Sequence, residues 1–553
     1  MFLTILAIKS VYADSTPLLN NEAYDKQIEN KIKKNENKAK NKPTKLNDSN
    51  NVTKFTGDID CDRYILDIDV ISINPLDVEL NKKVNFDNVT SQYIEQCLSS
   101  KNLINILNEL NSYLFLNGYV TSFVTLPKQN TNDGALRYES IYGRVDNVYI
   151  NGRNDALRNF LPIKNGDILQ VAFLDHTRDI INKGIGTIAQ FSVEPSNKEL
   201  YSDLYVSFEE PDSVFDSAIS IDNYGNLSNP YTINFTSKIS NILGFADLFY
   251  LRLTKDLKSG EAEFVSNIYV SYVQPFGRIE MSTFFSASET RSLLINQAFI
   301  NSSSQTYNLK LDYLLNRDSD SITKAYFNGR RYNSKSFLND IELESSRRNT
   351  LRLTFGLYHI LFLEDGWFDL DFSLSKGTSL FGSQEKLYSS TVSNDSESEK
   401  FSAKYLSFNF SYNKLNSFSG LDLSFNFSLN SQISSELLLS QERFGFGGPF
   451  TVRGINNNQY VSGDSGFYLN SNLYLDNFSY VKPFVGFDYG TIWNNDDFIR
   501  QKKESRSSVS FGLDLSYTKV TSSLTLSFPL DFVDDNFNAA DDLISYVNLS
   551  YKF

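Results

Sequence analysis

Apolar and polar residues alternate along most of the chain that follows Pro211. In Leu421–Asn430, LDLSFNFSLN, every second residue is apolar and the residues between them are polar. A period of two places the two sets on opposite faces of a β-strand. Sixteen such runs can be marked, and they begin near Val214, Tyr231, Ala246, Phe264, Arg278, Gln305, Ile322, Thr350, Phe368, Ser402, Ser419, Gly466, Val481, Ser508, Ser522 and Leu543.

These runs predict a transmembrane β-barrel of 16 antiparallel strands over residues 213–553. Apolar side chains would face lipid and polar side chains would face a water-filled lumen, and a closed bacterial barrel has an even number of strands. If the first run rises from the periplasm, the connections after odd-numbered strands are extracellular. The chain ends in YVNLSYKF, whose outward face would carry Val547, Leu549, Tyr551 and Phe553.

Residues 56–212 mix helical and strand periodicity, and one order of elements occurs twice. The pattern predicts two small α/β modules, at residues 56–142 and 143–212. An exposed edge strand in each would offer backbone pairing to an extended polypeptide. The expected elements are Tyr64–Ile73, helices Val89–Leu98 and Leu103–Leu114, Gly118–Pro127 and Ala135–Tyr142, and then Val145–Ile150, helices Ala156–Phe160 and Gln170–Asn182, Thr187–Val193 and Leu204–Phe208.

Two further segments precede the modules. Residues 1–13, MFLTILAIKSVYA, are apolar and end in Val-Tyr-Ala, which predicts a signal peptide. Residues 14–55 are polar and rich in lysine, which predicts a flexible linker or a solvated helix. If the chain is exported, Cys61 and Cys97 lie in an oxidising compartment, either as a disulfide or as two buried thiols.

Composition narrows the function further. The 553 residues contain no run of 18 apolar residues, so transmembrane helices are excluded and strands must do any spanning. Aromatic residues make up 14% of the chain, which suits lipid-facing positions and interfacial girdles. The formal net charge of -14 argues against nucleic acid as a partner.

Residues suited to catalysis are scarce. The chain has two histidines, His176 and His359, and two cysteines. It contains no GxxxxGK[ST] phosphate loop, no metal-spaced cluster and no serine nucleophile motif. The sequence therefore predicts no enzyme, no metal and no cofactor, and it predicts structural roles for both histidines.

The strand pattern is interrupted by a glycine-rich inward loop, predicted at residues 434–465. Arg453 is the only charged residue in the run Phe444–Tyr460. Asp488 follows on a strand, where Gly486 and Gly490 bracket it on one face and leave room beside it. We expect the loop to fold into the barrel so that the Arg453 guanidinium docks on Asp488. The alternative is a solvated arginine and an isolated lumen carboxylate.

These residues resemble two motifs of the two-partner secretion (TpsB) transporters, the haemolysin secretion/activation family of outer-membrane barrels. The resembling segments are RFGFGGPFTVRG, SGDSGFY and GFDYG. In that family a Val-Arg-Gly-Tyr loop tip lies inside the barrel and meets an Asp on a strand. The resemblance implies a contact between loop and barrel formed by Val452, Arg453, Gly454, Gly486, Asp488 and Gly490. The fourth tip position departs from the family, because it is Ile455.

The resemblance extends to the amino-terminal half, where GYVTSFVTLPKQ and GALRYESIYGRVDNVYING resemble the first polypeptide-transport-associated (POTRA) module of the family. It implies periplasmic POTRA modules, pairing of Cys61 with Cys97, and a plug helix near Leu18–Lys34. The terminal Phe553 resembles the signal read by the barrel-assembly machinery.

The function that the resemblance implies is secretion of a large exoprotein of the TpsA type through a barrel in the outer-membrane bilayer. Without a nucleotide site, the client must move without nucleotide hydrolysis. Two alternatives remain open: a barrel-assembly insertase of the same superfamily, and a passive porin with an accessory domain.

Overall fold

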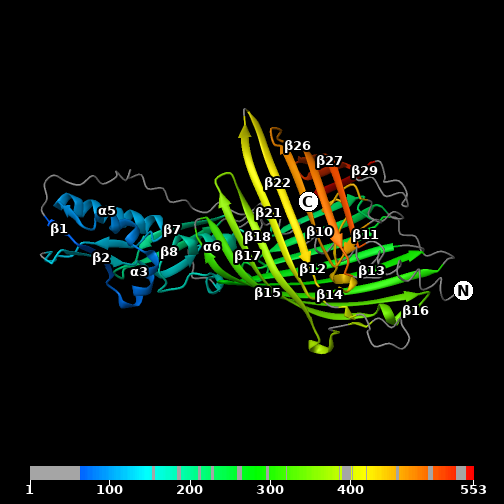
Figure 1. Ribbon diagram of the computed structural model, residues 1–553, viewed down its shortest axis with the longest axis horizontal. Coiled ribbons are helices and arrows are strands. Elements are labelled where there is room, and N and C mark those ends of the chain that lie inside the picture. The colour runs from blue at the N-terminus through cyan, green and yellow to red at the C-terminus, as the bar shows by residue number, and fades with distance from the viewer. Residues whose placement is uncertain are drawn as a thin grey trace.

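Two small α/β modules precede a large closed β-barrel, and the modules extend from one end of it (Figure 1). The predicted signal peptide, the linker and Cys61 lie outside the described residues, so these predictions stay untested. The structure, a computed structural model, describes residues 63–131, 133–151, 156–183, 188–208, 213–225, 230–257, 264–293, 298–318, 320–384, 387–388, 400–401, 403–418, 420–455, 460–495, 502–530 and 543–553.

The first module is a three-stranded sheet in the order β2-β5-β4, with helix α5 packed on one face. The apolar stripe that predicted this helix is buried against the sheet at Ile106, Leu110 and Leu114. Its elements are β1 (Arg63–Ile65), β2 (Asp67–Ser72), η1 (Pro75–Asp77), α3 (Val78–Val84), α4 (Asp87–Thr90), η2 (Ser91–Tyr93), β3 (Gln96–Leu98), α5 (Ser100–Leu116), β4 (Phe123–Thr125) and β5 (Ala135–Ile141).

The helix predicted at Val89–Leu98 is wrong over its second half. Glu95 adopts a left-handed φ of 59°, which ends the helical turn, and its N–H donates to Ile65 O at 2.8 Å. The following residues pair with β1 as strand β3, with Tyr64 opposite Cys97. Backbone pairing with a distant strand thus overrides the local helical pattern.

The second module repeats this plan. Its sheet has the order β6-β8-β7, with β6 parallel and β7 antiparallel to the central strand, as β2 and β4 are to β5. Helix α6 buries Ile180 and Ile181 in the module core. The elements are β6 (Arg144–Ile150), η3 (Ala156–Phe160), α6 (Val171–Ile181), β7 (Ala189–Pro195) and β8 (Tyr201–Phe208).

The barrel closes as a ring of sixteen antiparallel strands, which confirms the predicted fold class. Each alternating run overlaps one strand, and the two-residue β16 (Ile341–Glu342) adds to β15 only. The strands are β9 (Phe215–Asp222), β10 (Thr232–Ser240), β11 (Leu248–Asp256), β12 (Phe264–Phe276), β13 (Ile279–Leu293), β14 (Phe299–Arg317), β15 (Ser321–Leu338), β17 (Arg348–Leu363), β18 (Gly366–Thr378), β21 (Tyr405–Phe418), β22 (Leu421–Ile433), β25 (Ser465–Leu475), β26 (Val481–Trp493), β27 (Lys503–Tyr517), β28 (Val520–Pro529) and β29 (Ile544–Lys552).

The alternation that predicted the barrel is visible in the burial of its side chains. On β14, Tyr307, Leu309 and Leu311 are exposed, whereas Thr306 and Asn308 between them are buried. An exposed apolar face toward the outside is what contact with lipid requires, because lipid offers no polar partner.

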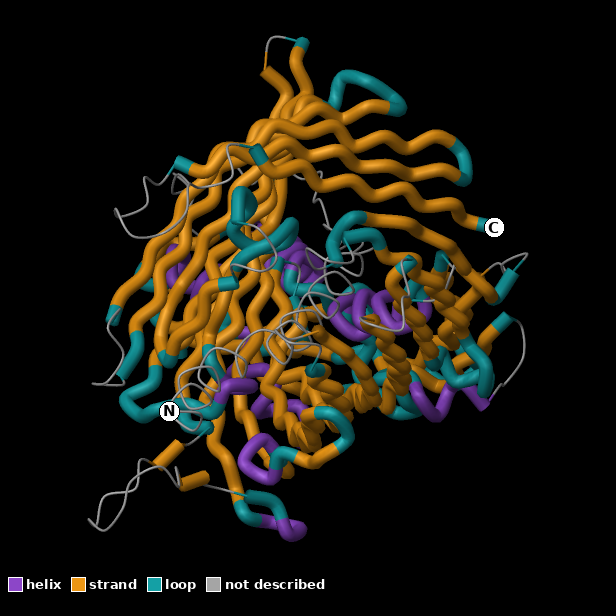
Figure 2. Tube along the Cα trace, turned by 90° about the vertical axis from the view of Figure 1, so that its right-hand side faces the viewer, coloured by secondary structure: helices purple, strands orange, loops and turns teal. Residues whose placement is uncertain are grey.

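The last strand closes the ring by pairing with the first. Leu549 of β29 lies opposite Ile221 of β9, and the N–H of Phe553 donates to Ser217 O at 3.1 Å. Val547, Leu549, Tyr551 and Phe553 are all exposed. Figure 2 views this ring from the barrel end opposite the modules. Among the described helices, none has the length and apolar character that crossing a bilayer would need.

Shorter elements lie between the strands. They are η5 (Glu344–Ser346), η6 (Leu380–Gly382), β19 (Leu387–Tyr388), β20 (Lys400–Phe401), η7 (Ser440–Glu442), β23 (Phe444–Phe446) and β24 (Val461–Gly463). The last three belong to the predicted inward loop, whose β23 and β24 pair as a hairpin.

Candidate functional site

The structure brings Arg453 of the inward loop onto Asp488 of β26. Arg453 Nε lies 2.6 Å from Asp488 Oδ2 and Nη2 lies 2.7 Å from Oδ1, so the guanidinium donates to both carboxylate oxygens. The backbone N–H of Arg453 also donates to Oδ2, at 3.0 Å. The side chains are 4% and 0% exposed, so water screens this ion pair little.

Neighbouring strands complete the hydrogen bonding of the pair. Asn472 of β25 accepts from Arg453 Nη1 at 2.8 Å, and Asn470 donates to Asp488 Oδ1 at 2.7 Å. The ring of Phe484 lies 5.7 Å from the guanidinium carbon. A buried ion pair needs such partners, because desolvating both charges otherwise costs more than their attraction returns.

The two glycines of the strand motif allow the loop to approach β26. A Cβ added at Gly486 would overlap Arg453 Nη2, and one at Gly490 would come within 2.8 Å of the Phe446 ring. Gly454, at the loop tip, has a φ of 79° and lies against Ser508. The strand therefore has no side chain at the two points where the loop lies against it.

Gly486→Ala is predicted to displace the guanidinium and to lower export at least tenfold, because the added methyl group occupies the position of Arg453 Nη2. Gly329→Ala on β15 is the matched control, since its Cβ would lie 3.7 Å from Leu353, an ordinary contact. Secreted client per unit of folded barrel is the measurement. Equal export by both variants would contradict the predicted role of this gap.

The loop also has a hydrophobic core of its own. Val452 is 0% exposed and packs with Phe446 and Ile455. Ile455, which departs from the family motif, is buried in this cluster, and its carbonyl accepts from Tyr546 Oη at 3.1 Å. An aliphatic side chain at this position therefore packs within the loop. The complete cluster is Phe444, Phe446, Val452, Ile455, Val461, Tyr468 and Ile492.

A second buried ion pair holds the base of the loop, and sequence reasoning missed it. Glu442 Oε2 pairs with Arg352 Nη1 of β17 and accepts from Tyr405 Oη of β21 at 3.0 Å. The side chains of Arg352 and Glu442 are 8% and 4% exposed. In β17 Arg352 alternates with outward residues and lies on the inner face, but nothing in the sequence identifies its partner 90 residues away.

These contacts make the loop a bridge across the lumen. At its base Glu442 reaches β17 and β21, and at its tip Ile455 reaches Tyr546 on β29. Between them, the Phe450 ring lies 5.4 Å from the Tyr224 ring, just beyond β9. The loop therefore contacts walls on both sides of β22, the strand from which it departs.

The second module docks on the turns at the near end of the barrel. The Phe160 ring stacks on that of Phe245 at 4.3 Å, and the N–H of Gly277 donates to Phe160 O at 2.8 Å. Arg317, at the end of β14, lies with Nε 3.4 Å from Asp179 of α6. Those turns are the ones predicted to face the periplasm.

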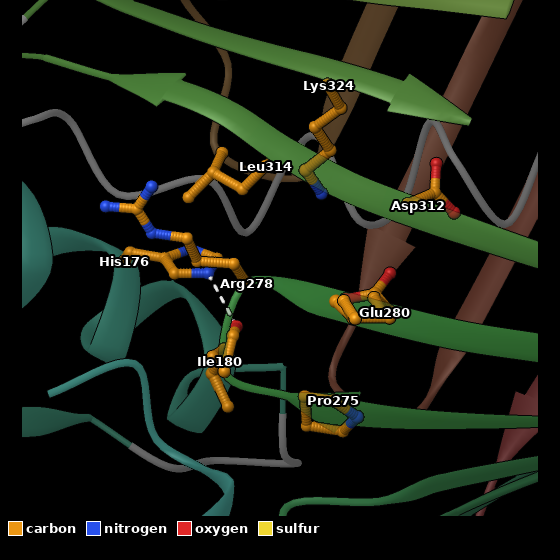
Figure 3. A pocket seen from close by; sticks show the side chains of 10 residues that line it. His176, Ile180, Pro275, Arg278, Glu280, Asp312, Leu314 and Lys324 are labelled. Atoms are coloured by element: carbon orange, nitrogen blue, oxygen red, sulfur yellow. Dashed lines mark hydrogen bonds between the residues drawn. The ribbon is translucent and has the colours of Figure 1, made fainter. Parts of the chain in front are cut away.

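His176 of α6 lies in a small pocket at this junction, with Glu280 and Lys324 on the barrel side (Figure 3). Its Nε2 donates to Gly277 O at 3.1 Å. Burial lowers the pKa of His176 to about 4, and the positive charge of Lys324 acts in the same direction. The ring is therefore a neutral contact in the junction, in keeping with the predicted structural role.

Docking of the second module should weaken as the pH falls from 6.5 toward 4. A His176 pKa of about 4, below the ordinary 6.5, means that the docked state binds fewer protons in that window. Amide exchange of α6, corrected for intrinsic rates, should rise on the order of tenfold at pH 5. His176→Gln should flatten this slope. Burial raises the pKa of Asp179, so its protonation favours docking as the pH falls. This contribution is present both in the wild-type protein and in the His176→Gln variant. Identical slopes would refute the assignment.

His359 also has a structural contact, with its Nδ1 2.9 Å from Thr323 Oγ1 on the neighbouring strand β15. Within the described residues, no group of three His, Cys, Asp or Glu side chains is placed to hold a metal ion.

A closed sixteen-stranded barrel, two α/β modules docked at one end and a loop held inside the lumen together define an outer-membrane barrel of the POTRA-bearing class. A family model described as haemolysin secretion/activation protein ShlB/FhaC/HecB matches residues 201–515, and one for the ShlB-type POTRA domain matches residues 72–139. The chain therefore belongs to the haemolysin secretion/activation family, the two-partner secretion transporters of the outer membrane. Its modules lie in the periplasm.

Similarity to individual proteins extends over most of the chain. Outer membrane transporter CdiB of Dickeya dadantii (strain 3937) is 22% identical over 390 residues, covering 70% of this chain and 68% of the relative. Hemolysin transporter protein ShlB of Serratia marcescens is 23% identical over 446 residues, covering 78% and 77%. The solved structure of CdiB from Escherichia coli matches with a TM-score of 0.82 at 20% identity, covering 97% of this chain and 98% of that one.

Proposed function

We propose that this chain captures a large exoprotein of the haemolysin or adhesin type in the periplasm, through its two modules, and secretes it unfolded through the barrel. The family membership supports transport as the general function. The observation that carries the proposal for this chain is the bridge formed by the inward loop, which two buried ion pairs hold to β17 and to β26, five strands apart in the ring. The bridge organises the route that the client takes.

Free strand edges in both modules support capture in an extended form. In the first module β2 pairs only with β5 within its sheet, and in the second β7 pairs only with β8. The edges of β4 and β6 are partly occupied, by Asn111 at Val124 and by residues 166–169 at Val145. An unpaired edge offers a row of backbone donors and acceptors to an extended segment, without requiring one particular client sequence.

Transport without nucleotide hydrolysis is the second part of the proposal. The sequence carries no phosphate-binding loop, and the modules face the periplasm. The direction of movement would come from folding of the client outside the cell, because a folded client cannot return through the lumen. The protein would act as a transporter and not as an enzyme.

Several features of the sequence enter the proposal as parts that still need their own tests. They are the signal peptide at residues 1–13, the linker with a candidate plug helix at residues 14–55, the domain limits at 56–142, 143–212 and 213–553, the Cys61–Cys97 disulfide, and recognition of Phe553 by the barrel-assembly machinery.

The test is export of a large protein encoded beside this chain, measured in cells that carry both. We expect the client in the medium with the complete chain, and none when residues 63–208 are deleted from an otherwise folded barrel. A client that ends in the outer membrane would favour the insertase. Small-solute flux that is independent of the modules, without client export, would favour the passive porin.

A further inference from the structure

Positive side chains gather on the outer face of the barrel wall formed by β14, β15, β17 and β18. On β15 the buried Tyr332, Ser334 and Ser336 face inward, so the alternate residues Arg331 and Lys335 face outward. On β18 the buried Ser375 faces inward. Lys376 therefore faces outward, like the exposed Leu374 two residues before it. Lys335 and Lys376 are exposed, and Arg331 is half-buried.

These cations lie at the far end of the wall from the modules. The β14–β15 turn, near Arg317 and Ser321, contacts the second module. Arg331 follows Ser321 by ten residues on β15, which corresponds to about 33 Å along the strand and roughly 25 Å in height at the usual tilt. That height is about the height of the apolar band of an outer-membrane barrel. Arg331 therefore lies where the hydrocarbon ends and the outer-leaflet headgroups begin.

Strand register places Arg331 and Lys376 within reach of one ligand, with Lys335 further along β15. Arg331 lies opposite Leu351 of β17, which lies opposite Thr378, two residues beyond Lys376. With strands about 4.8 Å apart, the Cα atoms of Arg331 and Lys376 are roughly 12 Å apart. Lys335 lies four residues beyond Arg331 on β15, roughly 14 Å away and on the side of Arg331 that faces away from Lys376.

The surroundings supply hydrogen-bonding groups above and apolar groups below. Arg331 Nη2 donates to Asn349 at 3.1 Å, and the exposed Gln305 lies opposite Asn333. Below Arg331, Gly329 lies between Leu309 and Leu353, where the absence of a side chain leaves room for an acyl chain.

Charge balance identifies the kind of ligand. Within the described residues, no ion pair involves Arg331, Lys335 or Lys376, although the chain as a whole has a formal net charge of -14. Two acids lie near Lys335. Glu289 of β13 is two strands away, since each is opposite Ser303, and Glu342 of β16, opposite Phe337, is paired with Arg347. An unpaired positive cluster at headgroup level attracts anionic lipid.

We propose that Arg331, Lys335 and Lys376 form a binding site for a phosphorylated glycolipid of the outer leaflet, of the lipid A type. Two phosphates on one disaccharide would engage cations on β15 and β18, while the acyl chains lie along the apolar wall below them. Basic groups near the lipid surface attract anionic headgroups, and the three together would give roughly a hundredfold in affinity.

The test uses full-length protein purified in detergent and depleted of lipid, and follows its melting temperature against the concentration of bis-phosphorylated lipid A. A ligand that binds the folded state raises the melting temperature in a saturable way. The variant carries Arg331→Gln, Lys335→Gln and Lys376→Gln. The matched control removes the same charge at the periplasmic end, with Lys414→Gln, Lys482→Gln and Lys519→Gln.

We expect the wild-type protein and the matched control to respond alike, and the apparent Kd of the variant to rise at least tenfold. Heat-modifiable mobility in gels shows that all three barrels are folded. Equal responses of the variant and the wild-type protein would overturn the proposal. So would an equal response of the wild-type protein to inorganic phosphate, which would mean a free-anion site, or to dephosphorylated lipid A, which would mean that the acyl chains suffice.

Discussion

Arg453→Ala is expected to abolish export while leaving the barrel inserted and folded. The substitution leaves Asp488, which is 0% exposed, without its cation, and an unpaired buried charge costs about 3–5 kcal/mol. That cost falls on the docked position of the loop more than on the barrel, because the backbone ladder that joins β26 to β25 and β27 stays in place. The loop should therefore leave the wall before the barrel unfolds.

Secreted client and heat-modifiable mobility, measured on the same cells, separate these two effects. Arg252→Ala is a matched control, since this inner-wall arginine of β11 donates to Asn234 at 2.8 Å. Arg453→Lys should restore export only in part, because an ammonium cannot reproduce the two parallel contacts of the guanidinium. Normal secretion by Arg453→Ala would refute the proposed role of the pair.

The barrel could be predicted from the sequence because lipid outside and water inside select opposite residue types at every second position. Each strand therefore carries the full signal locally, as in Leu421–Asn430. The modules carry a weaker signal, since their short strands depend on pairing with distant segments. Strand β3 shows the result: Gln96–Leu98 was expected to be helical but pairs with β1.

The two ion pairs of the loop differ in what the sequence could reveal. Arg453 and Asp488 were identified because glycines surround both, and such glycines indicate a close approach of backbones. Glu442 and Arg352 have no such context: Arg352 is one of several inward polar residues of β17, and its partner depends on the path of the loop through the lumen. That path is a property of the packed structure and not of any local segment.

The two ion pairs also fix different parts of the loop. Arg453 fixes the tip of the loop near β26, whereas Glu442 fixes its base to β17 and β21. Gln441 adds a contact to Thr350 Oγ1 at 3.3 Å, next to Arg352 on the inner face of β17. A bridge held only at its tip could swing about its base, so the second pair determines whether the loop crosses the lumen along one path.

Arg352→Glu is accordingly expected to reduce export at least tenfold. Two carboxylates would then face each other in a site where Glu442 is 4% exposed, and one of them would have to take up a proton or leave. The double exchange Arg352→Glu with Glu442→Arg restores opposite charges and should recover part of the export. Recovery in the double exchange, compared with either single change, reports on this pairwise contact.

Single-channel conductance in planar bilayers gives a readout that does not depend on the client. We expect Arg352→Glu to produce larger and noisier currents, because the base of the bridge is released from the wall, and the double exchange to return them toward wild type. Arg252→Glu, on an inward position of the distant strand β11, changes the lumen charge equally and serves as the control. If that control disturbs the current as much as Arg352→Glu does, lumen charge and not the Glu442 contact governs the pore, and the loop depends on its tip alone.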